Sequence, residues 1–550
     1  MKRREIKKIP YLVICLCVAL VMTGGFFDHS VAWIGVAIAG CLFAMLLTGA
    51  DFCGRDKRIV FFIPEVIVCI ALVVSFWAID YMENFMGVMR LLVICLWMYL
   101  VRSRSEAECA LAKALVPVMG CISVVISLIS LLVPSLTARF WENSRMSGFF
   151  QYANTSGLFF AVGIMLAIYQ MKKSEKKILS LIAIAILMMG LLLSGSRSVL
   201  LLLAGWGVYY AVCKKEYRKP FLMSAMLLLV FGGGYVFLTG NTANIGRIFT
   251  IFTSNSTLWG RLLYYRDAML LLMSKFWGLG RLGYYYSQGT FQSGIYHIRF
   301  VHNDFLQVAL DYGMLALVLV VLFLGWQIFK GAQSREEKEL LLFMALASVV
   351  DFHCQYLFIV MLMCLFLDYG KGEREKKAQL KENYVMLPIM LAMFVYIGIA
   401  TGSSKAGNQE LTLSMLPDYT SAQEKVLISN IGAPATYETA TDLIEKNPYN
   451  LTGYLVRGYF YATQLCVEEF IADWDRMLEL DPYNVEYYVQ YEQMIGNMEQ
   501  ALLRLEGREA ETDIELLRDR KSSLAGQLAE LKDRTSALAY KIKDIPVFSY

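Results

Sequence analysis

The stretch RFVHNDFLQVALDYG, residues 299–313, places His302 directly before a long apolar run. An imidazole titrates near neutral pH, so a histidine can take a proton from a hydroxyl group or hold an anion. A histidine that only bonds to a neighbouring carbonyl at a membrane surface is the more frequent case. The residues around His302 therefore decide whether it takes part in chemistry.

The segment before this histidine is rich in arginine. Between residues 239 and 302 the single acid is Asp267, and the cations are Arg247, Arg261, Arg266, Lys275, Arg281 and Arg299. A planar guanidinium binds two phosphate oxygens at once and keeps its charge. Attraction to anionic lipid headgroups is the simpler explanation, worth about 1 kcal/mol per basic residue. The choice of arginine over lysine favours an anion-binding site.

The other residues with reactive side chains form no recognisable metal site. There is no HExxH or CxxC pattern, and most of the twelve cysteines lie in apolar stretches, which predicts no extracellular disulfide framework. The histidines are His29, His297, His302 and His353. We therefore expect metal-independent chemistry, with no cofactor and no nucleic-acid partner.

The composition is that of a membrane protein, with 57% apolar residues, 18% charged residues and a mean hydropathy of +0.49. Apolar runs near the length of a membrane span, about 17–25 residues, recur at 11–27, 31–50, 59–79, 85–101, 111–133, 152–171, 177–194, 197–213, 219–238, 304–330, 338–352, 355–369 and 384–401. This pattern predicts an all-α, polytopic membrane protein with about 12–13 transmembrane helices. The short runs 338–352 and 355–369 fit a re-entrant hairpin equally well.

Lysine and arginine gather in short segments, such as KRREIKK, KKSEKK and KKEYRK, which all fall on one side when the spans are threaded in order. Short basic loops stay on the cytoplasmic side, whereas long loops are translocated whatever their charge. The N-terminus is therefore expected on the cytoplasmic side of the cell membrane. The loop 239–302 and the tail 402–550 are expected on its outer side.

Ionisable residues also occur within the expected spans, where they are functional candidates. Glu65 and Arg90 lie on consecutive spans, and we expect them to form a structural pair. Asp351 stands beside His353 near an outer turn.

Four separated segments together resemble the bacterial O-antigen ligase and polymerase superfamily. They are NSRMSGFFQYAN with Arg145 and Asn154, SGSRS with Arg197, GRLLYYRDAMLLLMSKFWGLGRLGY with Arg261, and VHNDFLQVALDYG with His302. Tyr265 stands where many members carry tryptophan, and Asp311 where glutamate is frequent. The resemblance covers residues 130–330 well and the other helices by topology alone.

The resemblance implies a membrane glycosyltransferase that moves a glycan from a polyprenyl-diphosphate carrier to a glycan, lipid or protein acceptor on the outer face. Arg197, Arg261 and His302 would be catalytic, with the arginines at the diphosphate and His302 either a general base or a diphosphate contact. Residues that would bind substrate are Arg145, Asn154, Arg266, Arg281 and Asn303. A transporter or flippase of a lipid-linked saccharide is the alternative, but it would bind near the midplane. A non-catalytic scaffold would leave the outer arginines unexplained.

The tail is polar and helical, and we expect it to bind a protein partner. NPYN at 447–450 recurs as DPYN at 481–484, so that Pro448 and Pro482 are one tetratricopeptide period apart. Leucines recur every seventh residue from Leu517 to Leu538, which fits a coiled coil or a long helix packed on the repeat. The expected divisions are N-terminal membrane helices (1–130), a ligase-like core (131–370), a last span (371–401), a tetratricopeptide-like extracytoplasmic domain (402–485) and a long helical segment (486–550).

Overall fold

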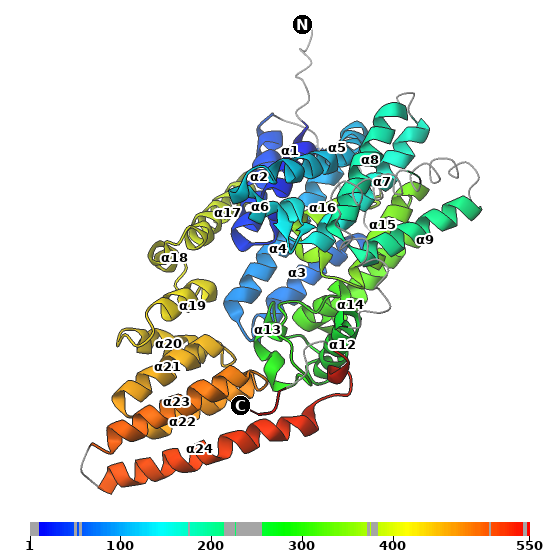
Figure 1. Ribbon diagram of the computed structural model, residues 1–550. Helices are drawn as coiled ribbons and strands as arrows, with labels where there is room; N and C mark the ends of the chain where they lie inside the picture. Colours follow the sequence, from blue (N-terminus) through cyan, green and yellow to red (C-terminus); the bar gives the residue numbers. More distant parts are fainter. Residues whose placement is uncertain are drawn as a thin grey trace.

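The computed structural model is all-α, and a membrane part and a C-terminal tail lie end to end in it (Figure 1). The structure describes residues 10–48, 52–53, 58–173, 177–213, 226, 256–370, 374–375, 383–504, 508–542 and 547–549. The membrane part contains α1 (Tyr11–Val21), α2 (Asp28–Thr48), α3 (Ile63–Val74), α4 (Tyr81–Ser103), α5 (Glu106–Ser130), α6 (Pro134–Phe140), α7 (Ala153–Lys173), α8 (Lys177–Ser194), α9 (Arg197–Cys213), α12 (Ser256–Ser274), α13 (Gly283–Ser287), α14 (Asp304–Lys330), α15 (Arg335–Ser348), α16 (Leu357–Leu365) and α17 (Asn383–Lys405). Two short strand pairs accompany them, β1 (Phe52–Cys53) with β4 (Arg374–Glu375) and β2 (Trp141–Glu142) with β3 (Arg145–Met146).

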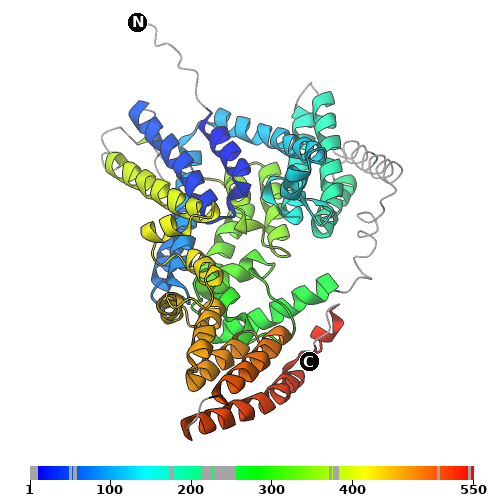
Figure 2. The ribbon, with the colours of Figure 1, turned by 60° about the vertical axis from the view of Figure 1, so that its left-hand side comes forward.

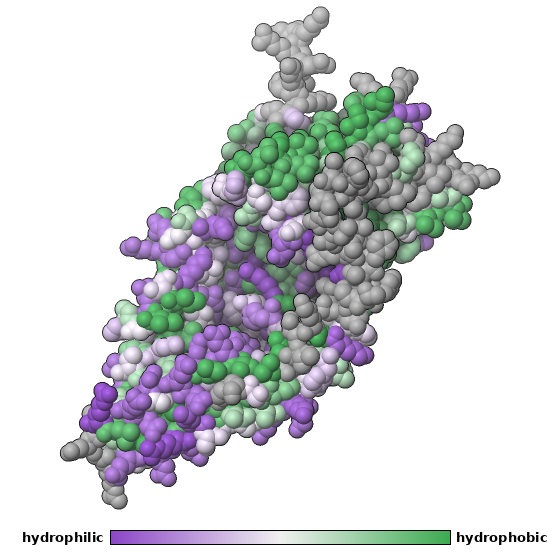
Figure 3. Space-filling model, in the orientation of Figure 1, coloured by the Kyte–Doolittle hydropathy of each residue, from purple (hydrophilic) through white to green (hydrophobic). Residues whose placement is uncertain are grey.

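Within the described residues, seven helices are long and apolar enough to cross a membrane, namely α2, α4, α5, α7, α8, α14 and α17. Three shorter helices, α1, α3 and α9, are also apolar. The prediction of an all-α, polytopic membrane protein is thus confirmed. Apart from Met226, the expected span 219–238 lies outside the described residues. Apolar side chains cover much of the membrane part, and hydrophilic ones gather towards the tail (Figure 3).

The two short apolar runs after residue 338 form two short helices, α15 with 14 residues and α16 with 9. Both are shorter than the roughly 17 residues that a membrane span needs. They meet at the loop 349–356, which includes a 3₁₀ turn, His353–Gln355. α16 packs on α4, where the buried Trp97 indole donates to the carbonyl of Met361 at 2.9 Å. The loop between the two helices is therefore anchored to the centre of the bundle.

The expected pair between Glu65 and Arg90 does not form. The Arg90 guanidinium donates instead to the carbonyls of Gly25, Phe26 and Gln355, at 3.0, 2.8 and 2.5 Å. These carbonyls belong to the segments that link α1 to α2 and α15 to α16. A charged donor that satisfies three backbone acceptors joins these two turns to α4.

The tail is built from helices that pack in succession, α18 (Gln409–Met415), α19 (Thr420–Ser429), α20 (Thr436–Lys446), α21 (Leu451–Gln464), α22 (Val467–Leu480), α23 (Val485–Leu502) and α24 (Arg508–Arg534) (Figure 2). The helices α21 and α22 lie between the recurring NPYN and DPYN segments. Asn450 caps α21 by accepting from the amide of Gly453 at 3.1 Å. Arg457 on α21 and Asp473 on α22 form a two-point ion pair at 2.8 and 2.7 Å. The assignment of this hairpin to a tetratricopeptide repeat stays a prediction.

The leucine stripe of the last helix faces the tail itself. Leu517, Leu524 and Leu531 are buried in one apolar cluster with Tyr491 of α23 and Trp474 of α22. The arrangement therefore matches the second expectation, a long helix packed on the preceding hairpins.

Several contacts attach the tail to the membrane part, and two of them mark how far the tail extends along it. At the first, Asp80, the N-cap of α4, accepts from the Thr420 hydroxyl at 2.7 Å and from the Asn447 amide at 3.1 Å. At the second, the amide of Ser536 donates to the carbonyl of Ser293 at 2.9 Å, and the Lys541 ammonium lies 4.3 Å from the ring centroid of Trp259 on α12. The tail therefore reaches from α4 to α12.

Candidate active site

Asp351, in the loop between α15 and α16, has a fully buried carboxylate that gathers donors from several segments. Its Oδ1 accepts from the Tyr152 hydroxyl at 2.9 Å, and its Oδ2 from the Asn154 amide at 2.7 Å. Arg261 Nη2 lies 3.1 Å from Oδ2, and His302 Nδ1 lies 3.0 Å from Oδ1. A buried carboxylate with these partners is stabilised in its ionised form. These five residues are named the Asp351 cluster.

Arg261 is carried by α12. Leu263 and Leu272 of α12 are buried, whereas Leu258 near its start is exposed. Asp267, further along the same helix, accepts from the amide of Ser293 at 2.8 Å and so fixes α12 to the segment before His302. The Arg261 side chain keeps 20% of its surface exposed. Its guanidinium is therefore held from one side and open on the other.

His302 lies in the turn directly before α14, with a left-handed backbone (φ +32°). Few residues other than glycine adopt this conformation, and strained residues of this kind cluster at functional sites. The Tyr265 hydroxyl donates to the carbonyl of His302 at 2.5 Å. Because Nδ1 faces the Asp351 carboxylate, the proton is placed on Nδ1 and Nε2 is left as the basic nitrogen. Among the described residues, no group hydrogen-bonds to Nε2.

Arg145 in β3 joins the cluster through Asn154, which lies in the first turn of α7. Arg145 Nη2 donates to Asn154 Oδ1 at 2.5 Å, and Asn154 in turn donates to Asp351. The Nε of Arg145 donates to the carbonyl of Ser194 at 2.7 Å. The arginine thereby connects the Asp351 cluster to the end of α8.

Arg197 is the first residue of α9 and is half-buried. It follows Ser194 and Gly195, where a left-handed glycine (φ +59°) makes the turn between α8 and α9. Through the bond from Arg145 to Ser194, the turn that carries Arg197 adjoins the segment that holds Asn154. The structure therefore brings the segments of Arg145, Asn154, Arg197, Arg261 and His302 to one region of the membrane part.

The other residues expected to bind substrate have different partners. Arg281 is buried and forms ion pairs with Asp28 at 3.0 Å and Glu83 at 2.7 Å. Arg266 is half-exposed and pairs with Asp267 at 3.0 Å. The side chain of Asn303 caps α14 by accepting from the amide of Leu306 at 3.0 Å. None of these contacts involves the Asp351 cluster.

Asp351 and Tyr152 belong to the candidate site although sequence reasoning did not place them there. The available signal was that Asp351 is an acid inside an apolar stretch. Neighbouring His353 is also buried, with its Nδ1 3.1 Å from the Thr155 hydroxyl. Within the part of the chain that the structure describes, no three His, Cys, Asp or Glu side chains gather as ligands for a metal.

Comparison with known proteins gives one match. Residues 182–321 match a family model described as O-antigen ligase. Arg197, Arg261 and His302 lie inside this segment, whereas Arg145, Asn154 and Asp351 lie outside it. No curated protein and no solved structure matches the chain. The family match agrees with the motifs found in the sequence and supports a relationship of this segment to the O-antigen ligase superfamily.

Proposed function

We propose that this protein transfers a glycan from a polyprenyl-diphosphate carrier to a hydroxyl group of an acceptor, at the outer face of the cytoplasmic membrane and without a metal. The observation that carries the proposal is the Asp351 carboxylate, which holds a guanidinium and an imidazole side by side. The Arg261 guanidinium can bind an anionic leaving group, and the His302 imidazole can take the proton of a hydroxyl nucleophile.

Arg261 is assigned to the leaving group. Its Nη2 is engaged by Asp351, and among the described residues Nη1 and Nε have no hydrogen-bond partner. Donors fixed in place before the reaction stabilise negative charge as it develops on the departing diphosphate. Arg197 is assigned to the same diphosphate from the start of α9. Arg145 and Asn154 hold the surrounding segments in position.

His302 is assigned to the acceptor hydroxyl. Its Nε2 accepts the hydroxyl proton while the oxygen forms a bond to the anomeric carbon of the donor. The bond between that carbon and the phosphate oxygen breaks, and the electron pair leaves with the diphosphate. Asp351 orients the imidazole and stabilises the imidazolium that forms. A direct contact of His302 with the diphosphate remains the alternative role, and the two roles differ in their dependence on pH.

The membrane part also offers space for a lipid chain. A cavity of about 230 Å³ is lined mostly by apolar side chains of α3, α4, α14 and α16, such as Ile67, Leu91, Val308 and Met363. Its polar lining residues include Arg90, Arg281, Asp304, Asp311, Ser348 and Gln355, of which Asp304 follows His302 by two residues. This position supports a donor whose lipid chain enters the membrane part while its diphosphate stays beside Arg261.

The outer location is supported by the distribution of charge. The described ends of α4, α7 and α14 that lie away from the Asp351 cluster carry basic residues, such as Arg102, Lys173 and Lys330. Basic segments of this kind stay in the cytoplasm. The tail and the Asp351 cluster would then share the outer side.

The test is a reconstituted reaction with purified full-length protein, a polyprenyl-diphosphate oligosaccharide and a chelator. Product should form, and Arg261→Ala and His302→Ala should abolish it while the proteins stay folded. Lys275→Ala, which removes an exposed cation just after α12, is the matched control and should stay active. A fully active His302→Ala protein would exclude the assigned chemistry. Movement of the lipid-linked saccharide across vesicles without product would favour the transporter.

A further inference from the structure

A pocket of about 170 Å³ lies where the membrane part meets the tail. It is bounded by the start of α2, the end of α17, α19 and the segment just before His302. The charged residues that line it are Asp28, Glu83, Arg281, Arg299, Lys405 and Lys425. The pocket is several times larger than the roughly 30 Å³ that a water molecule occupies in the liquid. It therefore has room for a ligand larger than a single water.

The charges of this pocket are unbalanced. Both acids, Asp28 and Glu83, pair with Arg281. Arg299, Lys405 and Lys425 are exposed, and among the described residues none of the three has an ion-pair partner. With four cations and two carboxylates, the charged side chains that line the pocket carry a formal net charge of +2.

The contacts of these three cations are with neutral groups. The Lys425 ammonium donates to the hydroxyl and the carbonyl of Ser404 at 3.0 and 3.3 Å. Lys405 lies 4.9 Å from the ring centroid of Phe27, and Arg299 lies 5.9 Å from that of Phe300. Each side chain is thus held at the pocket, and none of these contacts is with a carboxylate.

The three cations also affect one another. Partial burial and the charge of Lys405 lower the pKa of the Lys425 ammonium, while Glu424 opposes this effect. Glu424 is itself bonded to the amide of Asn450 at 2.7 Å. An anion in the pocket would relieve the repulsion between the lysines, because an opposite charge favours the charged form of both.

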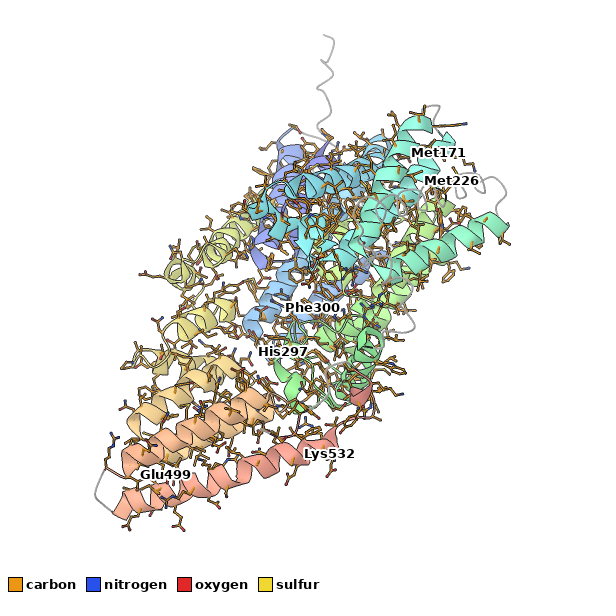
Figure 4. All side chains as sticks on the ribbon, in the orientation of Figure 1. Met171, Met226, His297, Phe300, Glu499 and Lys532 are labelled. Carbon is orange, nitrogen blue, oxygen red and sulfur yellow. The ribbon has the colours of Figure 1, made fainter. Side chains whose placement is uncertain are left out.

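The pocket adjoins the Asp351 cluster through an aromatic pair. Phe300 contacts Phe26 of the pocket, with ring centroids 6.0 Å apart, and Phe352 on its other side, at 5.5 Å. The ring of Phe352 lies 4.9 Å from that of His302. Figure 4 shows Phe300 between the membrane part and the tail, in the middle of the molecule. A ligand in the pocket would therefore be one aromatic layer away from His302.

We propose that this pocket binds a negatively charged group, a carboxylate or a phosphate, on the saccharide that the Asp351 cluster transfers or extends. This inference rests on the proposed function. Two features favour a saccharide over a phospholipid headgroup. Lys425 and Ser421 come from the tail, and the half-buried rings of Phe26 and Phe27 line the pocket as apolar surface against which a sugar can pack.

The test measures binding rather than transfer. The full-length protein in detergent is titrated calorimetrically with a glucuronate-containing tetrasaccharide and with neutral chitotetraose. We expect the acidic probe to bind at least about tenfold more tightly, as one hydrogen-bonded charge contact provides. Arg299→Gln should weaken binding of the acidic probe by roughly the same factor. The triple variant Arg299→Gln, Lys405→Gln, Lys425→Gln should remove the preference between the probes.

Lys532→Gln is the matched control, because this exposed lysine lies on α24 away from Phe300 (Figure 4). It should bind both probes like the wild type. The proposal is overturned if the two probes bind equally, or if Arg299→Gln keeps the wild-type preference. Phosphatidylglycerol is tested in the same way. The proposal is also overturned if the triple variant loses binding of phosphatidylglycerol but keeps binding of the acidic tetrasaccharide.

Failure of the proposed function gives a different result. Arg261→Ala should lose transfer and keep the preference for the acidic probe. If Arg261→Ala stays active, the assigned chemistry is wrong, but the pocket is still judged by the binding experiment alone.

Discussion

The Nδ1 atom of His302 lies 3.0 Å from Oδ1 of Asp351, although the two residues are 49 positions apart in the chain. The histidine comes from the start of α14 and the carboxylate from the loop between two short helices. The same carboxylate holds Arg261 through its other oxygen. One buried acid therefore sets the orientation of both groups to which we assign the chemistry.

Replacement of Asp351 by asparagine should keep the shape of the site and remove its charge. The imidazole would then lose the carboxylate that fixes its tautomer. We expect kcat to fall by about 10² or more, because a positioned general base contributes roughly 10²–10⁴ to a rate. KM for the lipid-linked donor should change little. Steady-state kinetics of D351N against D418N, which alters an acid in the tail, would measure this difference. Equal kcat values for the two variants would show that Asp351 has only a structural role.

The dependence on pH distinguishes the two roles of His302. If Nε2 takes the acceptor proton, kcat/KM should rise with pH, because a general base acts in its unprotonated form. If the imidazolium instead binds the diphosphate, kcat/KM should fall over the same range. The profile of the wild-type protein with a saturating acceptor decides between the two, and a flat profile would contradict both.

Arg145→Lys tests the connection between the Asp351 cluster and α8. Arg145 bonds the carbonyl of Ser194 through one nitrogen and the side chain of Asn154 through another. A lysine places its donors on a single nitrogen and cannot reproduce this geometry. We expect kcat/KM to fall about tenfold, which corresponds to the loss of one charge-assisted hydrogen bond. An unchanged kcat/KM would mean that this link does not position the site.

Arg281 and Arg266 should differ in their effect on stability. Arg281→Ala leaves the carboxylates of Asp28 and Glu83 without their cation, and breaking a buried pair costs about 3–5 kcal/mol. Arg266→Ala removes a half-exposed side chain, for which about 1 kcal/mol or less is expected. The thermal unfolding midpoint in detergent would show a large decrease for R281A and a small one for R266A. Similar midpoints for the two variants would contradict the structural role of Arg281.

Glu424 gives the tail a dependence on pH. Burial raises the pKa of this carboxyl to about 7, although the hydrogen bond from Asn450 opposes the shift. A raised carboxyl pKa means that the folded state binds more protons than the unfolded state between about pH 4.5 and pH 7. Stability from this group is therefore present at low pH and is lost as the pH rises through about 7. The unfolding midpoint should fall more between about pH 5.5 and pH 8 in the wild type than in Glu424→Gln. Parallel curves for the two proteins would rule out this group as the cause.

The class of fold was accessible from the sequence, because apolar runs of span length and the positions of basic residues each depend on neighbouring residues alone. Helix bounds such as those of α8 and α14 follow the predicted runs closely. The short helices α15 and α16 were ambiguous, since their apolar runs are at the lower limit of a span.

The candidate site was accessible only in part. The motifs identified Arg145, Asn154, Arg261 and His302, which the structure brings together. They did not identify the acid that joins these residues, because its contacts cross 49, 90 and 197 positions of the chain. The partners of Arg281 are also distant in the chain. Glu83 on α4 lies 198 positions away, and Asp28 is at the start of α2, so that the residues next to Arg281 gave no sign of either ion pair.

The length of α24 determines how far the tip of the tail lies from the last turn of this helix. This helix has 27 residues, and at about 1.5 Å per residue it spans roughly 40 Å. Its last turn lies near α12, and its first turn points away from the membrane part (Figure 1). A molecule bound at the first turn of α24 would therefore lie roughly 40 Å from the last turn, where Arg534 donates to the carbonyl of Gly289. That length would separate a partner held at the tip of the tail from the junction between the tail and the membrane part.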